Sequence, residues 1–129
     1  VVTIAAPFET RHLARLLADT KAAAEVQGEA RVTIGGTTFK LKKQFFDDLE
    51  RTNMQRAIET LQRPLLVMHS PADQTVDIEN AMEIFAAARH PKSFVSLDRA
   101  THVLSDQQDS WYAGEVIAAW ASRYLETPS

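Results

Sequence analysis

The chain has 129 residues, and its formal net charge at pH 7 is -3. The length is that of one ordinary domain, and the charge disfavours nucleic acid as a partner, because such proteins usually neutralise phosphates with a basic surface. The lack of cysteine excludes disulfides and Cys-ligated zinc and suits a cytoplasmic protein, and no apolar run approaches the roughly 20 residues of a membrane-spanning helix, so a membrane is not an expected partner.

In chain order, a strand and a helix are predicted first. Val1–Ala5 is apolar and β-branched on both faces, as is typical of a buried parallel strand, and Pro7 ends it. From about Thr10, apolar side chains recur at helical spacing as far as Gly28, a residue type that commonly ends helices. We therefore expect a helix directly after the strand.

A β-hairpin is predicted next. Residues 30–34 and 37–42 alternate apolar and polar side chains, and Gly35-Gly36 between them suits a two-residue turn. This arrangement places the apolar side chains of both strands on one face. The predicted cross-strand pairs are Ile34 with Thr37, Val32 with Phe39, and Ala30 with Leu41.

The second half of the chain alternates helices and strands. A short amphipathic helix over 54–61 precedes the strand Leu65–His69, and a helix with apolar residues over 81–88 precedes the strand Ser93–Leu97. A strand, helix, strand order requires a right-handed crossover and parallel neighbours. The predicted fold class is therefore α/β, with three core parallel strands flanked by helices.

One more helix is predicted at the end of the chain. Ser105 with Gln108 three residues later forms a capping-box pattern at its start. Aromatic and apolar side chains then recur every four residues, which predicts a face packed on the core. The residues of this stripe are Tyr112, Val116, Trp120 and Tyr124.

Two polar residues follow neighbouring strands at the point where each strand ends. Asp73 comes after the strand Leu65–His69, and His102 comes after the strand Ser93–Leu97. Adjacent strands lie only about 4.8 Å apart, and parallel strands end at the same edge of a sheet, so we expect the two side chains to meet. A carboxylate that accepts a hydrogen bond from one imidazole nitrogen leaves the other nitrogen free to act as a base.

Plainer roles compete with this catalytic interpretation. Asp73 also suits a turn that follows Pro71, and His102 also suits a hydrogen-bonded loop, although we favour a catalytic role for both. Asp77 directly precedes a helix and is expected to be its N-cap, while His69 is expected to be structural. A metal site built from the two histidines and Asp73 lacks the ligand spacing of motifs such as HExxH, so no metal or cofactor is expected.

Two segments resemble the last third of an α/β-hydrolase: RPLLVMHSPADQTVDIENAMEIF and FVSLDRATH, with the acid before the histidine. The resemblance implies that Asp73 is the acid and His102 the base of a Ser-His-Asp triad. Ala100-Thr101 departs from the glycine and acid that often precede the family's histidine. The combination HPKSFVSLD further resembles the hydrolase portion of proteins in which a hydrolase is fused to an OsmC-like redox domain.

The resemblance also implies a division of the chain. By this resemblance, residues 1–129 are expected to form a single domain, the C-terminal part of an α/β-hydrolase. Val1–Pro7 corresponds to the strand after the family's nucleophile helix, residues 8–62 form a lid-like insertion with the hairpin and a helix, and residues 63–126 supply the final strands and helices.

The family's nucleophile lies in a G-x-S-x-G motif, and no such motif occurs in these 129 residues. The resemblance therefore implies that the serine lies upstream of Val1, and that this chain is the acid- and histidine-bearing portion of a carboxylesterase-type serine hydrolase for small-molecule ester or acyl substrates. By itself the chain is expected to be inactive. The alternative is a non-catalytic module that packs or dimerises, and we expect a homodimer through the edge strand Val1–Ala5.

Overall fold

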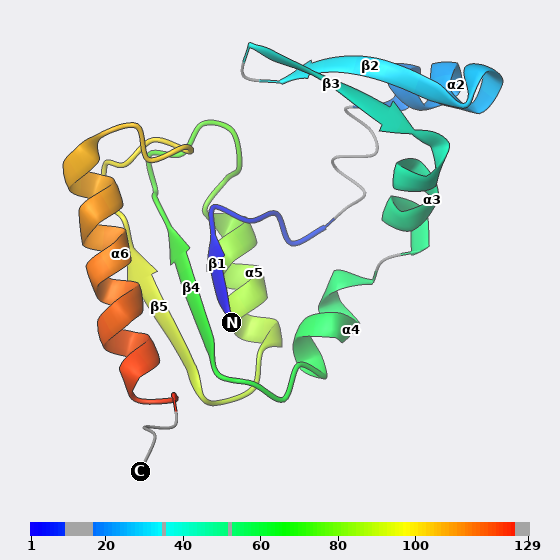
Figure 1. Ribbon diagram of the computed structural model, residues 1–129. Helices are drawn as coiled ribbons and strands as arrows, with labels where there is room; N and C mark the ends of the chain where they lie inside the picture. Colours follow the sequence, from blue (N-terminus) through cyan, green and yellow to red (C-terminus); the bar gives the residue numbers. More distant parts are fainter. Residues whose placement is uncertain (10–16, 35, 52, 126–129) are drawn as a thin grey trace. The chain divides into compact units, whose positions relative to one another are not determined.

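The computed structural model describes residues 1–9, 17–34, 36–51 and 53–125 (Figure 1). These residues form two compact units, the first built from Val1–Phe8 and the chain from Gln55 onward, the second from Glu9–Met54. The expected single domain over 1–129, with a lid-like insertion at 8–62, stays a prediction. Among the described residues, no helix has both the length and the apolar character that crossing a bilayer requires.

The first unit is built on a parallel three-stranded sheet (Figure 1). β4 (Leu65–His69) lies between β1 (Val2–Ile4) and β5 (Lys92–Ser96). All five residues of β4 are buried, because the strand has a neighbour on each side and helices over both faces. The predicted α/β class with three parallel core strands is confirmed.

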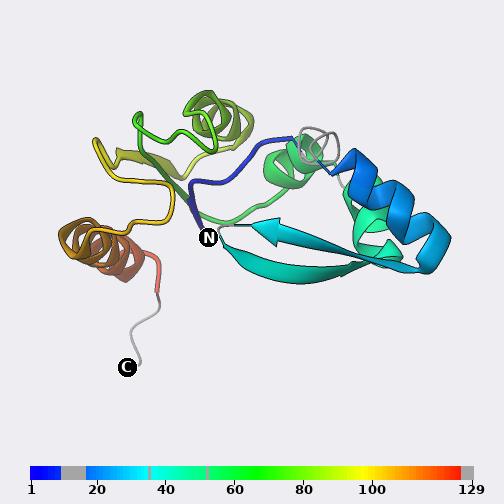
Figure 2. The same cartoon turned by 90° about the horizontal axis from the view of Figure 1, so that it is seen from above.

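Helices cover the two faces of this sheet. α5 (Glu79–Ala87) and α6 (Gln107–Ser122) lie on opposite faces (Figure 2), and the short α4 (Met54–Glu59) precedes β4. Leu66 and Met68 of β4 join a buried apolar cluster with residues of α6 and of the loop after β5. Burying side chains of this size contributes about 1.5–3 kcal/mol each, so this cluster anchors α6 to the centre of the sheet.

The start of α6 differs from the prediction by one residue. Asp106 is the N-cap, and its carboxylate accepts a hydrogen bond of 2.8 Å from the backbone N–H of Gln108. The hydroxyl of Ser105 lies 2.8 Å from the Thr101 hydroxyl. The predicted capping box at Ser105 is therefore wrong, and Asp106 caps the helix in its place.

The face of α6 that packs on the sheet also differs from the predicted stripe. Val116 and Trp120 contact the core cluster as expected, but Tyr112 is exposed. Positions four apart drift about 40° around a helix at each step, so a strict spacing of four leaves the buried face. Ala113 and Ile117 complete that face.

The first strand is less buried than the sequence pattern predicts. Val1 is 54% exposed and Ile4 is 39% exposed. β1 is the edge of the described sheet, with β4 as its neighbour, so the prediction of a strand buried on both faces is wrong for these two side chains.

The described residues of the second unit form a hairpin and two helices. The helix α2 (Ala18–Gln27) leads into β2 (Glu29–Ile34), and β3 (Thr37–Lys42) leads into α3 (Lys43–Arg51), a helix that was not predicted. The predicted hairpin register is confirmed in all three cross-strand pairs. A small apolar core of Leu17, Ala24 and Phe46 is covered by side chains of the hairpin.

Two glycines of this unit adopt a left-handed backbone conformation. Gly28 ends α2 and Gly36 lies in the hairpin turn, and both have φ of 81°, a left-handed conformation that glycine adopts without strain at Cβ. The predicted helix start near Thr10 and the turn residue Gly35 lie outside the described residues.

Candidate active site

Asp73 lies in the loop that leaves the carboxyl end of β4, and its side chain is almost fully buried. One carboxylate oxygen, Oδ1, accepts hydrogen bonds from the backbone N–H groups of Thr75 at 2.8 Å and Val76 at 2.9 Å. The backbone N–H of Asp73 donates to the carbonyl of Ser70 at 3.1 Å. Asp73 is thus a turn residue, as its plainer interpretation predicts, and its second oxygen is left for another partner.

The partner of the second carboxylate oxygen, Oδ2, is His102. Nδ1 of His102 lies 2.8 Å from Oδ2 of Asp73, and the imidazole is 31% exposed. The loops after β4 and β5 bring the two residues together at one edge of the sheet, as the strand order predicts. The expected contact is present in the structure, and a catalytic role for the pair is a matter of proposal.

Hydrogen bonding keeps Asp73 ionised. Burial by itself raises the pKa of Asp73, but hydrogen bonds from the Val76 N–H, the His102 ring and the Thr75 N–H outweigh burial, and the pKa lies below its ordinary value. An ionised carboxylate only accepts hydrogen bonds, so Nδ1 of His102 carries the hydrogen between them. The other ring nitrogen, Nε2, is then unprotonated in the neutral imidazole and can accept a proton.

His69, the last residue of β4, makes a side-chain hydrogen bond to the loop that carries Asp73. Its imidazole is 1% exposed, and Nε2 lies 2.7 Å from the carbonyl oxygen of Val76. A carbonyl only accepts hydrogen bonds, so Nε2–H is the donor. The same nitrogen lies 3.5 Å from Oδ2 of Asp73, which is too long for a strong hydrogen bond. This placement agrees with the structural role expected for His69.

Ser70 joins the two loops of the site, a role that the sequence analysis missed. The buried hydroxyl of Ser70 donates to the carbonyl of Asp98 at 2.7 Å and accepts from the N–H of Ala72 at 3.1 Å. Asp98 lies near the start of the loop that carries His102, and its φ is 46°. A serine directly before a proline at a strand end is a common turn pattern, so sequence alone indicated the turn but not the bond across it.

Asp77, the other acid near this edge, was expected to be the N-cap of α5, but the N-cap residue is Ile78 and Asp77 lies one position before it. Its Oδ1 accepts a hydrogen bond of 2.8 Å from the backbone N–H of Glu79, the first residue of α5. Asp77 is therefore occupied at the start of that helix and does not compete with Asp73 for the histidine.

Within the described part of the chain, no serine hydroxyl reaches the ring of His102, whose hydrogen-bond partner there is Asp73. The described residues also contain no group of three or more His, Cys, Asp or Glu side chains placed to hold a metal ion. Among the described residues the site therefore consists of a buried carboxylate hydrogen-bonded to a partly exposed histidine ring.

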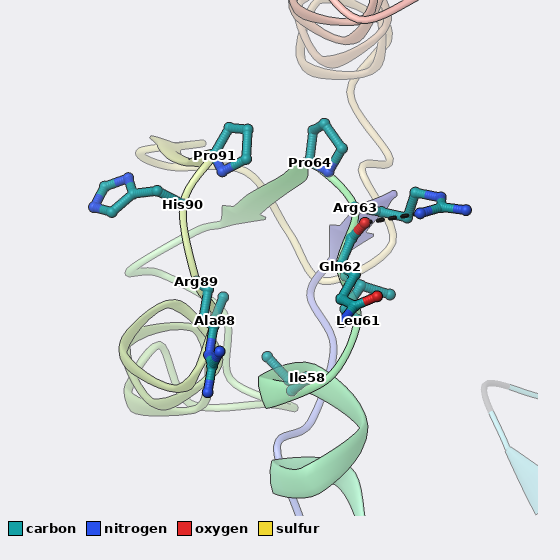
Figure 3. A pocket seen from close by; sticks show the side chains of 9 residues that line it. All are labelled: Ile58, Leu61, Gln62, Arg63, Pro64, Ala88, Arg89, His90 and Pro91. Carbon is teal, nitrogen blue, oxygen red and sulfur yellow. Dashed lines mark hydrogen bonds between the residues drawn. The ribbon is translucent and has the colours of Figure 1, made fainter.

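A separate cavity of about 280 Å³ lies at the other end of β4, where Pro64 and Pro91 precede β4 and β5 (Figure 3). Its charged and titratable side chains are those of Arg63, Arg89 and His90. Figure 3 shows Arg63 and His90 directed away from the space between the two segments, and Arg63 donates to the carbonyl of Gln62 at 2.9 Å. This cavity takes no part in the site of Asp73 and His102.

Comparison with known proteins gives matches among solved structures. No protein-family model matches the chain, and no curated protein matches it. The esterase domain of a Rhodothermus marinus protein is 46% identical, with a TM-score of 0.76, over 95% of this chain and 50% of that one. Mouse alpha/beta hydrolase domain-containing protein 10 is 14% identical, with a TM-score of 0.66, over 96% of this chain and 52% of that one.

Est1E from Butyrivibrio proteoclasticus is 12% identical, with a TM-score of 0.62, over 97% of this chain and 51% of that one. At such identities the last two matches concern the fold alone. The chain spans about half the length of each of these structures.

Proposed function

The chain has a partial α/β-hydrolase fold, and from this premise we propose that it is the acid- and histidine-bearing portion of a serine hydrolase of the carboxylesterase type. Asp73 is the triad acid and His102 the general base, and the nucleophilic serine comes from residues other than these 129. The observation that carries the proposal is the 2.8 Å hydrogen bond between His102 Nδ1 and the buried Asp73 carboxylate.

The proposed reaction is acyl transfer to serine followed by hydrolysis. Nε2 of His102 takes the serine proton as the serine oxygen bonds to the ester carbonyl carbon, and it then gives that proton to the departing alcohol oxygen. Water repeats the cycle on the acyl-enzyme, and the serine regains its proton as the acid product leaves. Asp73 stays ionised throughout and stabilises the imidazolium that forms at His102.

One comparison supports this reaction class. The Rhodothermus marinus structure is named an esterase domain and is 46% identical to this chain, which spans half of it. The chain itself contains no G-x-S-x-G motif, so in the proposal the serine and its oxyanion hole come from the half of the fold that these residues do not represent. The proposed substrates are small-molecule esters or acyl compounds.

The fusion to an OsmC-like domain and the cytoplasmic location stay predictions.

The test uses a protein that joins this chain to a preceding segment with the G-x-S-x-G motif. We expect a fluorophosphonate probe to label its serine and p-nitrophenyl acetate to be hydrolysed, and we expect His102→Ala to lower kcat by about 10⁴-fold or more. His90→Ala is the matched control, because His90 is exposed and lies at the other end of β4. Equal activity in the His102→Ala and His90→Ala proteins would refute the proposal.

A second candidate function is a dimerising module, favoured by the exposed edge of β1. Within the described residues β1 pairs with β4 and has no strand on its other side, and Val1 and Ile4 are exposed. Such an edge presents unpaired backbone groups along an apolar strand, and a second copy related by a two-fold axis can pair with it antiparallel. Light scattering after size exclusion should then give twice 14.4 kDa, and a monomer at micromolar concentration would exclude this dimer.

A further inference from the structure

We propose that His69 is a positioning residue for the acid loop: through Val76 it holds Asp73 in the orientation in which Oδ2 faces His102. The catalytic consequence of this inference rests on the proposed function, but the positioning itself does not.

His69 is held rigidly by the sheet. It is the last residue of β4 and is paired with Ser96 of β5, and its own carbonyl accepts a hydrogen bond of 2.8 Å from the N–H of Leu97. Its imidazole is 1% exposed. A buried side chain on a central strand has little freedom to move, so it provides a fixed point at the base of the loop.

The contact from this fixed point reaches the carboxylate in two steps. His69 Nε2–H donates to the carbonyl of Val76 at 2.7 Å, and the N–H of Val76 donates to Oδ1 of Asp73 at 2.9 Å. Val76 is therefore fixed by His69 through its carbonyl, and it fixes Asp73 through its N–H group. A shift of Val76 moves the donor that orients Oδ1, and because the carboxylate is rigid, Oδ2 turns away from His102 with it.

The chemistry at this position favours a donor over simple packing. The four residues before His69 on β4 are buried and apolar, so an apolar side chain at 69 would continue the core but would leave the Val76 carbonyl without its partner. The bond between His69 and Val76 is partly buried, and most backbone carbonyls in folded proteins have a hydrogen-bond partner. The nitrogen Nε2 also lies 3.5 Å from Oδ2 of Asp73, so the N–H group adds a favourable dipole beside the ionised carboxylate.

The experiment compares two variants of the full chain by NMR of ¹⁵N-histidine-labelled protein. His69→Gln keeps an N–H donor on a side chain of similar reach, whereas His69→Leu has similar bulk and no donor. The readout is the ring Nδ1–H resonance of His102, which a hydrogen bond to a carboxylate shifts strongly downfield and protects from exchange. Circular dichroism establishes that each variant is folded, and Met68→Leu is the control for a change at a neighbouring buried position.

We expect the downfield resonance in the wild-type chain, in Met68→Leu and in His69→Gln, and its loss or an upfield shift in folded His69→Leu. An unchanged resonance in folded His69→Leu would overturn the inference, as would its loss in His69→Gln. If His69→Leu does not fold, His69→Asn replaces it, because its amide is one methylene shorter and is expected to miss Val76. If neither folds, the His69→Gln result decides.

The same variants test the catalytic consequence in the longer protein that carries a nucleophile motif. Displacement of a catalytic pair by a fraction of an ångström is expected to lower kcat about 10- to 100-fold with little change in KM for His69→Leu, and His69→Gln should restore most of the loss. Absence of esterase activity in the wild-type longer protein would refute the proposed function and leave the NMR result standing. Full activity with a displaced resonance would refute the catalytic consequence alone.

Discussion

Replacing Asp73 with asparagine is expected to destabilise the protein and to reverse the roles of the His102 nitrogens. The carboxylate accepts hydrogen bonds from Thr75, Val76 and His102. An asparagine of the same shape can keep the two backbone donors on its oxygen, but its NH₂ group then faces Nδ1–H of His102. Two donors cannot bond, so His102 must shift its hydrogen to Nε2 and lose its free base nitrogen.

The expected loss of stability follows from these contacts. Hydrogen bonds to a charged group contribute about 1.5–3 kcal/mol each and neutral ones about 1 kcal/mol, so making two backbone bonds neutral costs about 1–4 kcal/mol. The Asp73 side chain is 1% exposed, so solvent screens these bonds little. We expect the free energy of unfolding of Asp73→Asn to be lower by about 2 kcal/mol at pH 7.

The pH dependence of this difference has a definite sign. The pKa of Asp73 in the folded chain lies below its ordinary value of 3.8, so the folded state binds this proton less readily than the unfolded state. The stability that the carboxylate contributes is therefore fully present above that ordinary value and is lost as the pH falls through the lower folded pKa. The difference between wild type and Asp73→Asn should stay constant from pH 7 to pH 5 and shrink below about pH 4.

Urea unfolding followed by circular dichroism at several pH values measures this difference. Asp77→Asn is the matched control, since Asp77 is exposed, accepts one backbone N–H at the start of α5, and asparagine caps helices equally well. Its effect should stay within about 0.5 kcal/mol. Wild-type stability of Asp73→Asn at pH 7, or a difference that grows on acidification, would refute the assignment of Asp73 as a buried, ionised acceptor.

Three further predictions concern the chain as it stands. The chain alone should hydrolyse p-nitrophenyl esters no faster than its His102→Ala variant, because removing the serine from a triad costs on the order of a million-fold; substantial hydrolysis that is lost in the variant would contradict this. Ser70→Ala should lower the free energy of unfolding by about 1–2 kcal/mol in urea titrations, since the carbonyl of Asp98 loses its donor, and an unchanged midpoint would show that the bond between the loops contributes nothing. Ile4→Lys should convert the proposed homodimer to a monomer in light scattering, whereas Met82→Lys, at another exposed apolar residue, should not, and an unaffected dimer would place the interface elsewhere.

Local patterns were enough to predict much of the fold. The predicted strand Leu65–His69 is β4 residue for residue, because its first four residues are all apolar, as is typical of a strand buried on both faces. Alternation around the glycine turn set the hairpin register, since a slip of one residue would turn every apolar side chain to the other face. The meeting of Asp73 with His102 followed from topology, because parallel neighbours end at one edge of the sheet.

Only the tertiary structure determined the exposure of individual side chains and the hydrogen bonds between loops. The exposure of Ile4 follows from the place of β1 at the edge of the sheet, and the buried side of α6 is the one that packs against Leu66 and Met68 of β4. His69 donates a hydrogen bond to the carbonyl of Val76, and Ser70 donates one to the carbonyl of Asp98. The positions of these loop carbonyls cannot be predicted from the spacing of apolar residues in the sequence. Hydrophobic periodicity reports which face of an element is buried, whereas a hydrogen bond between loops requires a donor and an acceptor about 3 Å apart, and only the folded backbone determines that distance.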